Sequence, residues 1–223
     1  MSHDIAQRIT AIRRRLPEGV ELVAVSKFHP VEELLEAYGA GQRVFGESRV
    51  QELVLKVGAM PADVRWHFIG HLQTNKVRQI MGLCHMIESV DSVRLLELID
   101  RESERAGVVT RVLMQVHVAA EETKTGFEPG ELLDYFAARK FESLRATHLC
   151  GIMGMATNTD DMGRVRADFQ QIKGVFDRIL EIAPDLRGFD TVSMGMSDDR
   201  EVAIECGSTM VRIGTDIFGP RRY

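Results

Sequence analysis

The stretch ELVAVSKFHP at residues 21–30 contains the unit from which the chain is built. Its first six residues, ELVAVS, form a short apolar run of the kind that makes a buried strand. Pro30 follows after a brief connection and opens a segment of helical period, since proline is favoured in the first turn of a helix. The stretch therefore predicts a strand followed by a helix.

The same alternation continues along the rest of the chain. Further strands are predicted at residues 43–45, 66–69, 85–89, 112–118, 148–153, 189–193 and 210–213. Helices are predicted between them at residues 50–57, from about 74, from 91, from 129, at 161–182 and at 199–205. Strands that alternate with helices predict a parallel sheet, and about eight such units favour a closed (β/α)8 TIM barrel of the α/β class. An open doubly wound sheet is the alternative.

An additional helix is predicted ahead of the first strand. Ile5, Ile9, Ile12 and Leu16 recur at three- and four-residue spacing, which is the pattern of an amphipathic helix, and the Pro-Glu-Gly sequence at 17–19 ends it. No linker or low-complexity segment interrupts the chain. We therefore expect a single domain over residues 1–223.

Composition narrows the class of protein. Hydrophobic residues make up 44% of the 223 and charged residues 27%, as in ordinary globular proteins. A net charge of -5 without a basic stripe argues against a nucleic-acid partner, and no apolar run is long enough to span a membrane. The three cysteines, Cys84, Cys150 and Cys206, lack CxxC spacing and lie in or beside apolar stretches, which predicts buried free thiols. With no secretory signal at the N-terminus, a cytoplasmic protein is expected.

The residues that follow the strands are the candidate site, because the active sites of such barrels lie at the carboxyl ends of the strands. Lys27 follows the first strand. Apolar walls at the barrel mouth favour the neutral form of its amine, which can form a Schiff base with an aldehyde. A lysine in this position is, on its own, more often an ordinary surface residue.

Polar and small residues follow four other strands. Ser48 and His71 come after the second and third strands and could contact a ligand, although such a residue is, on its own, more often a turn or cap residue. The seventh strand runs into Ser193-Met194-Gly195-Met196-Ser197, and the eighth carries Arg212 ahead of Gly214 and Thr215. Barrels often bind phosphate at these two loops, where glycine, serine and threonine supply backbone N–H groups and hydroxyls. No metal-binding cluster is predicted.

A lysine that can form an imine and a phosphate site across the barrel mouth suit two kinds of protein. Pyridoxal 5'-phosphate (PLP) needs both features, and so does a class I aldolase that acts on a sugar phosphate. The residue types alone leave this choice open.

Five longer motifs favour the first possibility. AVSK at 24–27, FGES-x-VQE at 45–52, WHFIGHLQTNK at 66–76, SMGMSDD at 193–199 and GSTMVRIGTDIFG at 207–219 resemble the pyridoxal phosphate homeostasis proteins. That family is similar to the N-terminal barrel of alanine racemase, of the fold-type III group. The resemblance extends from about residue 20 to the end of the sequence.

The resemblance implies a role for each site residue. Lys27 matches the lysine that holds PLP as an internal aldimine, and Arg212 matches the arginine that faces the pyridine nitrogen. The positions Ser193, Ser197, Gly214 and Thr215 match those that bind the phosphate, and His71 lies in a loop that lines the cofactor. Ser48 departs from the family, which usually has asparagine there, a side chain with both an amide donor and a carbonyl acceptor and with longer reach.

The resemblance also implies a PLP carrier that buffers and delivers the cofactor, with little or no catalysis of its own. Alanine racemase uses a second domain and a tyrosine from its partner subunit, whereas none of the tyrosines here, Tyr38, Tyr135 and Tyr223, follows a strand at the mouth. A racemase-like enzyme is the alternative. The expected partners are PLP, other B6 vitamers and apo forms of PLP-dependent enzymes, and the expected oligomeric state is a monomer.

Overall fold

The computed structural model describes residues 3–121 and 125–220 and contains a closed ring of eight parallel strands. The strands are β1 Glu21–Val25, β2 Val44–Glu47, β3 Arg65–Phe68, β4 Met86–Val90, β5 Thr110–Val116, β6 Thr147–Gly154, β7 Thr191–Ser193 and β8 Met210–Ile213. Each strand pairs with the next along the chain, and β8 pairs with β1 through Leu22 opposite Val211. This last pairing confirms the TIM barrel and excludes the open sheet.

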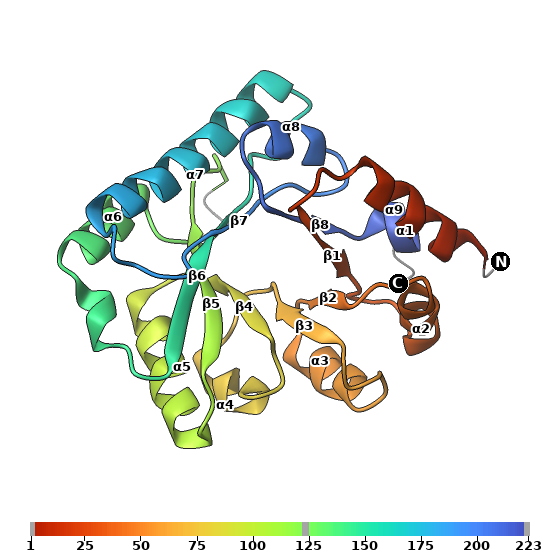
Figure 1. Cartoon of the computed structure of the whole chain (residues 1–223), viewed down its shortest axis with the longest axis horizontal. Helices are drawn as coiled ribbons and strands as arrows, with labels where there is room; N and C mark the ends of the chain where they lie inside the picture. The colour runs from red at the N-terminus through yellow and green to blue at the C-terminus, as the bar shows by residue number, and fades with distance from the viewer. Residues whose placement is uncertain (1–2, 122–124, 221–223) are drawn as a thin grey trace.

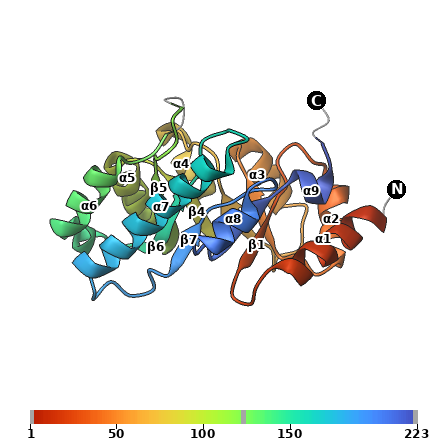
Figure 2. The same ribbon diagram turned by 90° about the horizontal axis from the view of Figure 1, so that it is seen from above.

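Helices surround the ring of strands (Figures 1 and 2). They are α1 His3–Arg15, α2 Val31–Gly39, α3 Val50–Val57, η1 Thr74–Lys76, α4 Val77–Ile80, α5 Val93–Ala106, α6 Pro129–Ala137, η2 Lys140–Ser143, α7 Met162–Ile182, α8 Arg200–Glu205 and α9 Thr215–Phe218. The additional N-terminal helix is confirmed as α1, and it lies beside α9 (Figure 1). No helix in the described ranges is both long and apolar enough to cross a membrane.

The helix predicted from about Thr74 is short and irregular in the structure. It consists of one 3-10 turn and one α-helical turn, and the Thr74 side chain caps neither of them. The next helix begins at Val93 rather than at Asp91, because Ser92 is its N-cap and accepts a hydrogen bond from the Leu95 N–H at 3.3 Å. Capping geometry of this kind determines the first residue of a helix more sharply than hydrophobic period does.

Side chains alternate between two environments along each strand. Outward-facing side chains such as Leu22, Ala24 and Val211 pack with the helices into the main hydrophobic core. Inward-facing ones form a smaller cluster inside the barrel, made of Val23, Val44, Met86, Leu113, Cys150, Met153 and Met210. Layers of bulky inward side chains are the normal filling of such barrels. The lower part of this barrel is therefore a packed core, and the site lies above it.

The three cysteines are free, as expected, but they are less buried than expected. Cys150 lies within the barrel, whereas Cys84 and Cys206 are partly exposed.

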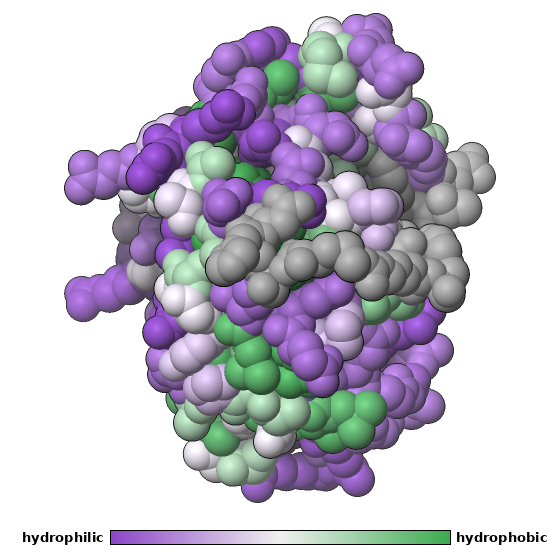
Figure 3. All heavy atoms as spheres, turned by 90° about the vertical axis from the view of Figure 1, so that its right-hand side faces the viewer, coloured by the Kyte–Doolittle hydropathy of each residue, from purple (hydrophilic) through white to green (hydrophobic). Residues whose placement is uncertain are grey.

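The outer surface on the right of Figure 1 is largely hydrophilic, with hydrophobic residues gathered in its lower part (Figure 3).

Candidate functional site

A cavity of about 260 Å³ opens at the carboxyl ends of the strands. Residues from the ends of β1, β2, β3, β6, β7 and β8 line it: Val25, Lys27, His29, Ser48, Ile69, Met155, Met196, Ser197, Asp198, Arg212, Gly214, Thr215 and Gly219. Six of the eight residues predicted for the site are among them, namely Lys27, Ser48, Ser197, Arg212, Gly214 and Thr215. The structure therefore brings together residues that lie far apart in the sequence.

Lys27 reaches the cavity because side chains along β1 point alternately into and out of the barrel, and Lys27 is at an inward position. Val23 faces the interior of the barrel, Val25 lines the cavity, and Lys27 continues the same parity two residues later. The lysine side chain is partly buried there, beside the apolar side chain of Val25. An amine in such a setting is suited to reaction with a carbonyl group.

Arg212 lies at the floor of the cavity and is 5% exposed. Its guanidinium donates hydrogen bonds to Ser193 Oγ at 2.6 Å and to the Gly154 carbonyl at 3.0 Å. The Glu88 carboxylate lies 3.9 Å from Arg212 and accepts a hydrogen bond from Ser193 Oγ at 2.6 Å. The direction of the guanidinium is thus determined by groups on three other strands.

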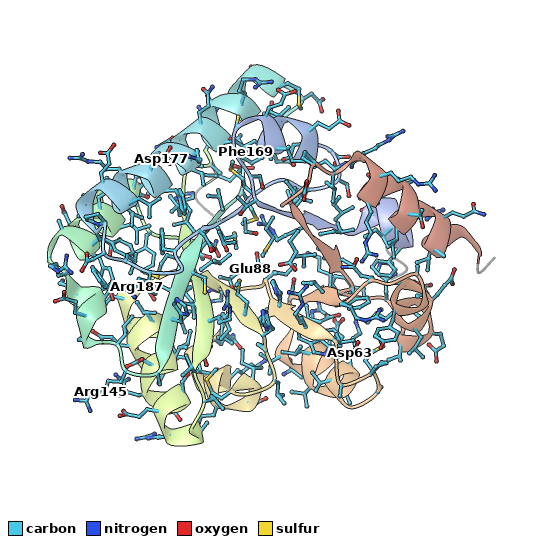
Figure 4. The ribbon with its side chains drawn as sticks, in the orientation of Figure 1. Asp63, Glu88, Arg145, Phe169, Asp177 and Arg187 are labelled. Carbon is cyan, nitrogen blue, oxygen red and sulfur yellow. The ribbon has the colours of Figure 1, made fainter. Side chains whose placement is uncertain are left out.

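Glu88 is the centre of this buried network and lies in the middle of the ring of strands (Figure 4). Its second oxygen is hydrogen-bonded to His67 Nδ1 at 2.7 Å, and both side chains are fully buried. Burial acts to raise the pKa of Glu88, but His67, Arg212 and Ser193 outweigh it and hold the pKa below its ordinary value. His67 is therefore a hydrogen-bonded histidine of the barrel interior.

Burial lowers the pKa of Arg212 from its ordinary value, while Glu88 and Asp199 act in the opposite direction. An arginine side chain remains protonated in proteins at ordinary pH. The floor of the cavity is therefore a fixed positive charge paired with a buried carboxylate.

The loops after β7 and β8 form one wall of the cavity. Ser197 and Thr215 supply hydroxyls there, and Gly214 lies between β8 and the start of α9. A Cβ atom on Gly214 would lie 3.2 Å from the Val25 carbonyl oxygen, so this backbone runs unusually close to β1. Small residues at these positions leave the backbone N–H groups accessible to a ligand. Such N–H groups bind anions, because they donate hydrogen bonds to anionic oxygens.

Ser48 and Ile69 form the opposite side, where the loops after β2 and β3 meet. A Cβ atom on Gly70 would lie 2.3 Å from the Ser48 carbonyl oxygen, which no side chain could tolerate without a shift of backbone. Gly70 is therefore required for the close approach of these two loops.

Two predicted residues lie outside the cavity. Ser193 is fully buried, because it pairs with Met210 in the barrel register and so lies one layer below Arg212. His71 is 59% exposed and bonds Asp91 Oδ2 at 2.9 Å, because β3 ends at Phe68 and the chain bends at Gly70. Local sequence shows neither the depth of a strand residue nor the direction of a loop after a bend.

Seven cavity residues are not among the predicted site residues: Val25, His29, Ile69, Met155, Met196, Asp198 and Gly219. His29 stacks on Phe218 with ring centroids 4.8 Å apart, and its Nδ1 bonds Glu33 at 2.8 Å. Asp198 and Met155 line the cavity from the loops after β7 and β6. Asp198 could have been found, since it belongs to the SMGMSDD motif, and Met155 lies two residues after the strand predicted at 148–153.

The chain matches known proteins along nearly its whole length. Residues 2–222 match the family described as alanine racemase, N-terminal domain. The pyridoxal phosphate homeostasis protein of Pasteurella multocida is 39% identical over 94% of this chain and 90% of its own. That of Schizosaccharomyces pombe is 38% identical over 91% of this chain and 84% of its own.

Solved structures agree with this assignment. PipY of Synechococcus elongatus, solved with PLP bound, is 36% identical, has a TM-score of 0.89 and covers 96% of this chain and 100% of its own. Alanine racemase from E. faecalis is 19% identical, has a TM-score of 0.74 and covers 98% of this chain and 58% of its own, which is a likeness of fold alone. The chain therefore belongs to the alanine racemase N-terminal domain family and, within it, to the pyridoxal phosphate homeostasis proteins.

Proposed function

We propose that this protein binds PLP in the cavity at the carboxyl ends of the strands and takes part in PLP homeostasis by holding and releasing the cofactor. The observation that carries the proposal is that Lys27 and Arg212 line the same cavity as the small-residue wall of Ser197, Gly214 and Thr215. Relatives with 36–39% identity carry the homeostasis name or hold PLP in a solved structure.

The donor set in the cavity is suited to each part of PLP. The Lys27 amine is the group that would hold the aldehyde carbon. The Ser197 and Thr215 hydroxyls and the backbone at Gly214 would bind the phosphate, because hydroxyls and N–H groups satisfy its oxygens. Arg212 would hold the ring nitrogen, and Ser48 would contribute one hydroxyl beside the ring.

When bound, PLP supplies an electrophilic carbon and a ring that can accept electrons. Arg212 would limit the second property, because a guanidinium does not give up its proton at ordinary pH, and a ring nitrogen that accepts its hydrogen bond would stay unprotonated. Glu88 and Ser193 keep the guanidinium in place and balance its charge. This arrangement favours storage of the cofactor over turnover of an amino acid.

The described tyrosines give no support to a racemase. The Tyr38 hydroxyl donates a hydrogen bond to Asp63 at 2.7 Å, and Tyr135 is buried in α6, so neither lines the cavity. Tyr223 lies outside the described residues. Racemisation by two bases needs a second proton-transfer group at the substrate.

Further parts of the proposal concern the partners, the cellular location and the oligomeric state of the protein. We propose that the protein also accepts other B6 vitamers, that it passes PLP to apo forms of PLP-dependent enzymes, and that it acts as a cytoplasmic monomer. The other vitamers, the location and the monomeric state rest on the sequence and on the family that it resembles, and the delivery of PLP rests also on the homeostasis name of the relatives.

The first experiment is a visible absorption spectrum of the purified protein after addition of PLP, followed by borohydride reduction and peptide mapping. We expect a yellow protein whose reduced pyridoxyl group maps to Lys27. The Lys27→Ala variant should lose the yellow absorbance, whereas Lys173→Ala, which removes a lysine paired with Asp177 on α7, should keep it. A wild-type protein that stays colourless would overturn the proposal and favour a Schiff-base aldolase.

A further inference from the structure

Two side chains of α3 contact the backbone on both sides of Lys27. Glu52 Oε2 accepts a hydrogen bond from the Phe28 N–H at 2.8 Å. Lys56 Nζ donates one to the Ser26 carbonyl at 2.9 Å. Residues four apart lie on the same face of a helix, so one face of α3 reaches the residue before Lys27 and the residue after it.

We call Glu52 and Lys56 the α3 clamp, and a buried cluster of charges holds it together. Lys56 is 7% exposed and lies 2.7 Å from Glu47 Oε1 and 3.3 Å from Glu52 Oε2. Ser26 Oγ also donates to Glu47 Oε1 at 2.6 Å. Charges that leave water are stable only when their partners are well placed, so this cluster has little freedom to rearrange.

The clamp acts from outside the barrel, whereas the Lys27 side chain is inside it. Ser26 has the outward parity of Leu22 and Ala24 in β1, and Lys27 has the inward parity of Val23 and Val25. The clamp residues do not line the cavity. Their contacts therefore act on the backbone on either side of Lys27.

The backbone at Phe28 needs such support. Its φ of 68° lies in the left-handed region, which is a genuine outlier for a bulky side chain. A conformation of this kind persists only where the surroundings impose it. The hydrogen bond to Glu52 does so at the Phe28 N–H, and the Arg49 guanidinium lies 4.5 Å over the Phe28 ring.

The Glu52 carboxylate is well suited to this contact. Burial acts to raise the pKa of Glu52, but the hydrogen bond from Phe28 and the charge of Lys56 outweigh it, so the pKa lies below its ordinary value. Glu52 is therefore ionised at neutral pH and makes a charge-assisted hydrogen bond, which is stronger than a neutral one.

We propose that Glu52, itself held by Lys56, is a positioning residue for Lys27: it keeps the Ser26–Phe28 segment in the one conformation that presents the lysine amine to the cavity, and so controls how firmly PLP is retained. The role in PLP retention rests on the proposed function, whereas the positioning of Lys27 exists in the protein without cofactor. The positioning of Lys27 and the retention of PLP can therefore be measured separately.

The test compares Glu52→Ala and Glu52→Gln with a matched control, Asp100→Ala. Asp100 on α5 is a buried carboxylate that, like the partly buried Glu52, accepts hydrogen bonds from backbone N–H groups, those of Arg145 at 3.0 Å and Ala146 at 2.8 Å. Those residues precede β6, at the end of the barrel opposite the cavity. The control therefore removes the same kind of contact away from Lys27.

Two measurements use the protein without PLP. The first is the amide resonance of Phe28 in protein labelled with ¹⁵N-phenylalanine, and the second is the rate at which acetic anhydride acetylates Lys27 relative to Lys173. We expect Glu52→Ala to move the resonance and change the relative rate, Glu52→Gln to give intermediate values, and Asp100→Ala to leave both unchanged.

The third measurement is the PLP dissociation constant from the visible absorbance, beside the melting temperature. We expect Glu52→Ala to weaken PLP binding about tenfold or more, as loss of a hydrogen bond to a charged group does, and Glu52→Gln to weaken it less. Asp100→Ala should lower the melting temperature and leave the dissociation constant unchanged.

The outcomes distinguish failure of the positioning role of Glu52 from failure of the proposed function. Wild-type PLP affinity and acetylation rate in Glu52→Ala, or an equal loss of affinity in Asp100→Ala, would refute the positioning role. If Glu52→Ala does not fold, Glu52→Gln decides, because it keeps an oxygen acceptor without the charge, and wild-type values for it would refute the role. A wild-type protein that takes up no PLP refutes the proposed function instead, and the two cofactor-free measurements still test the positioning of Lys27.

Discussion

At the residue scale, the network of Glu88 shows how a functional group depends on residues that the ligand never touches. Arg212 lines the cavity, but Ser193 and Glu88 determine where its guanidinium lies. The family resemblance assigns a cofactor-binding role to Arg212 and Ser193 alike. Only the structure separates the one at the cavity floor from the one beneath it.

Glu88→Gln should therefore destabilise the protein strongly. It removes the negative charge that balances buried Arg212, and breaking a buried ion pair costs about 3–5 kcal/mol. Chemical denaturation measures the change in the free energy of unfolding. The control is Glu181→Gln, whose pair with Arg178 is exposed and should contribute less than about 1 kcal/mol. Equal effects of the two variants would contradict this account of the network.

His85 carries a second prediction, on acid stability. Burial, with the nearby His67, Arg111 and Arg65 charges, lowers the pKa of His85 from 6.5 to about 4, and its ring stacks on that of His67. Below pH 6.5 the unfolded chain binds a proton at His85 that the folded protein takes up only near pH 4. The free energy of unfolding should therefore decrease as the pH is lowered from 6.5 to about 4, by at most about 1.4 kcal/mol per pH unit.

His85→Phe keeps an aromatic ring for the stack and removes the titration. Denaturation curves between pH 4 and pH 7 should show a smaller dependence on pH for this variant than for the wild type. Parallel dependences would show that other groups cause the loss of stability.

At the scale of elements, the loops after β2 and β3 depend on a single glycine. Gly70→Ala places a methyl group against the Ser48 carbonyl and should cost about 1–3 kcal/mol of stability, in the range of overpacked sites. It should also weaken PLP binding, because Ser48 and Ile69 line the cavity from the two loops that Gly70 allows to meet. Thermal unfolding and PLP titration measure the two effects.

Gly174→Ala is the matched control for that substitution. Gly174 lies within α7, and a Cβ atom there would meet nothing within 4 Å. Alanine should stabilise this helix by about 0.5–1 kcal/mol and leave PLP binding unchanged. A Gly70→Ala protein as stable as Gly174→Ala would show that the loops can separate without cost.

At the scale of the whole molecule, the pairing of β8 with β1 creates the site. Lys27 follows β1 and Arg212 lies in β8, so closure of the barrel brings together residues from nearly opposite ends of the sequence. A ligand that bridges them binds only the folded protein and stabilises it by mass action.

PLP should therefore raise the melting temperature, and free PLP at a hundred times the dissociation constant should add about 2.7 kcal/mol of stability. Differential scanning calorimetry over a series of PLP concentrations measures this, with pyridoxal as the comparison that lacks the phosphate. Light scattering on the same samples tests the predicted monomer. A melting temperature independent of PLP would contradict binding across the closed barrel.

Much of the architecture and part of the site followed from the sequence. The alternation of apolar runs with helical segments predicted the barrel and the approximate position of every strand, because both periods are local properties of the chain. The same alternation located Lys27, Arg212 and Gly214 at strand ends. Family resemblance then assigned a role to each residue, and six of the eight predicted site residues line one cavity.

The depth of each residue in the barrel was decided only by the tertiary structure. Ser193 and Arg212 both face inward, but the register between β7 and β8 places them in different layers. His71 lies outside the cavity because the chain bends after β3, and α3 contacts the backbone around Lys27 through long-range packing. Strand period and turn composition depend on neighbours in sequence. Register, layer and helix docking depend on closing the whole barrel, and no local pattern encodes them.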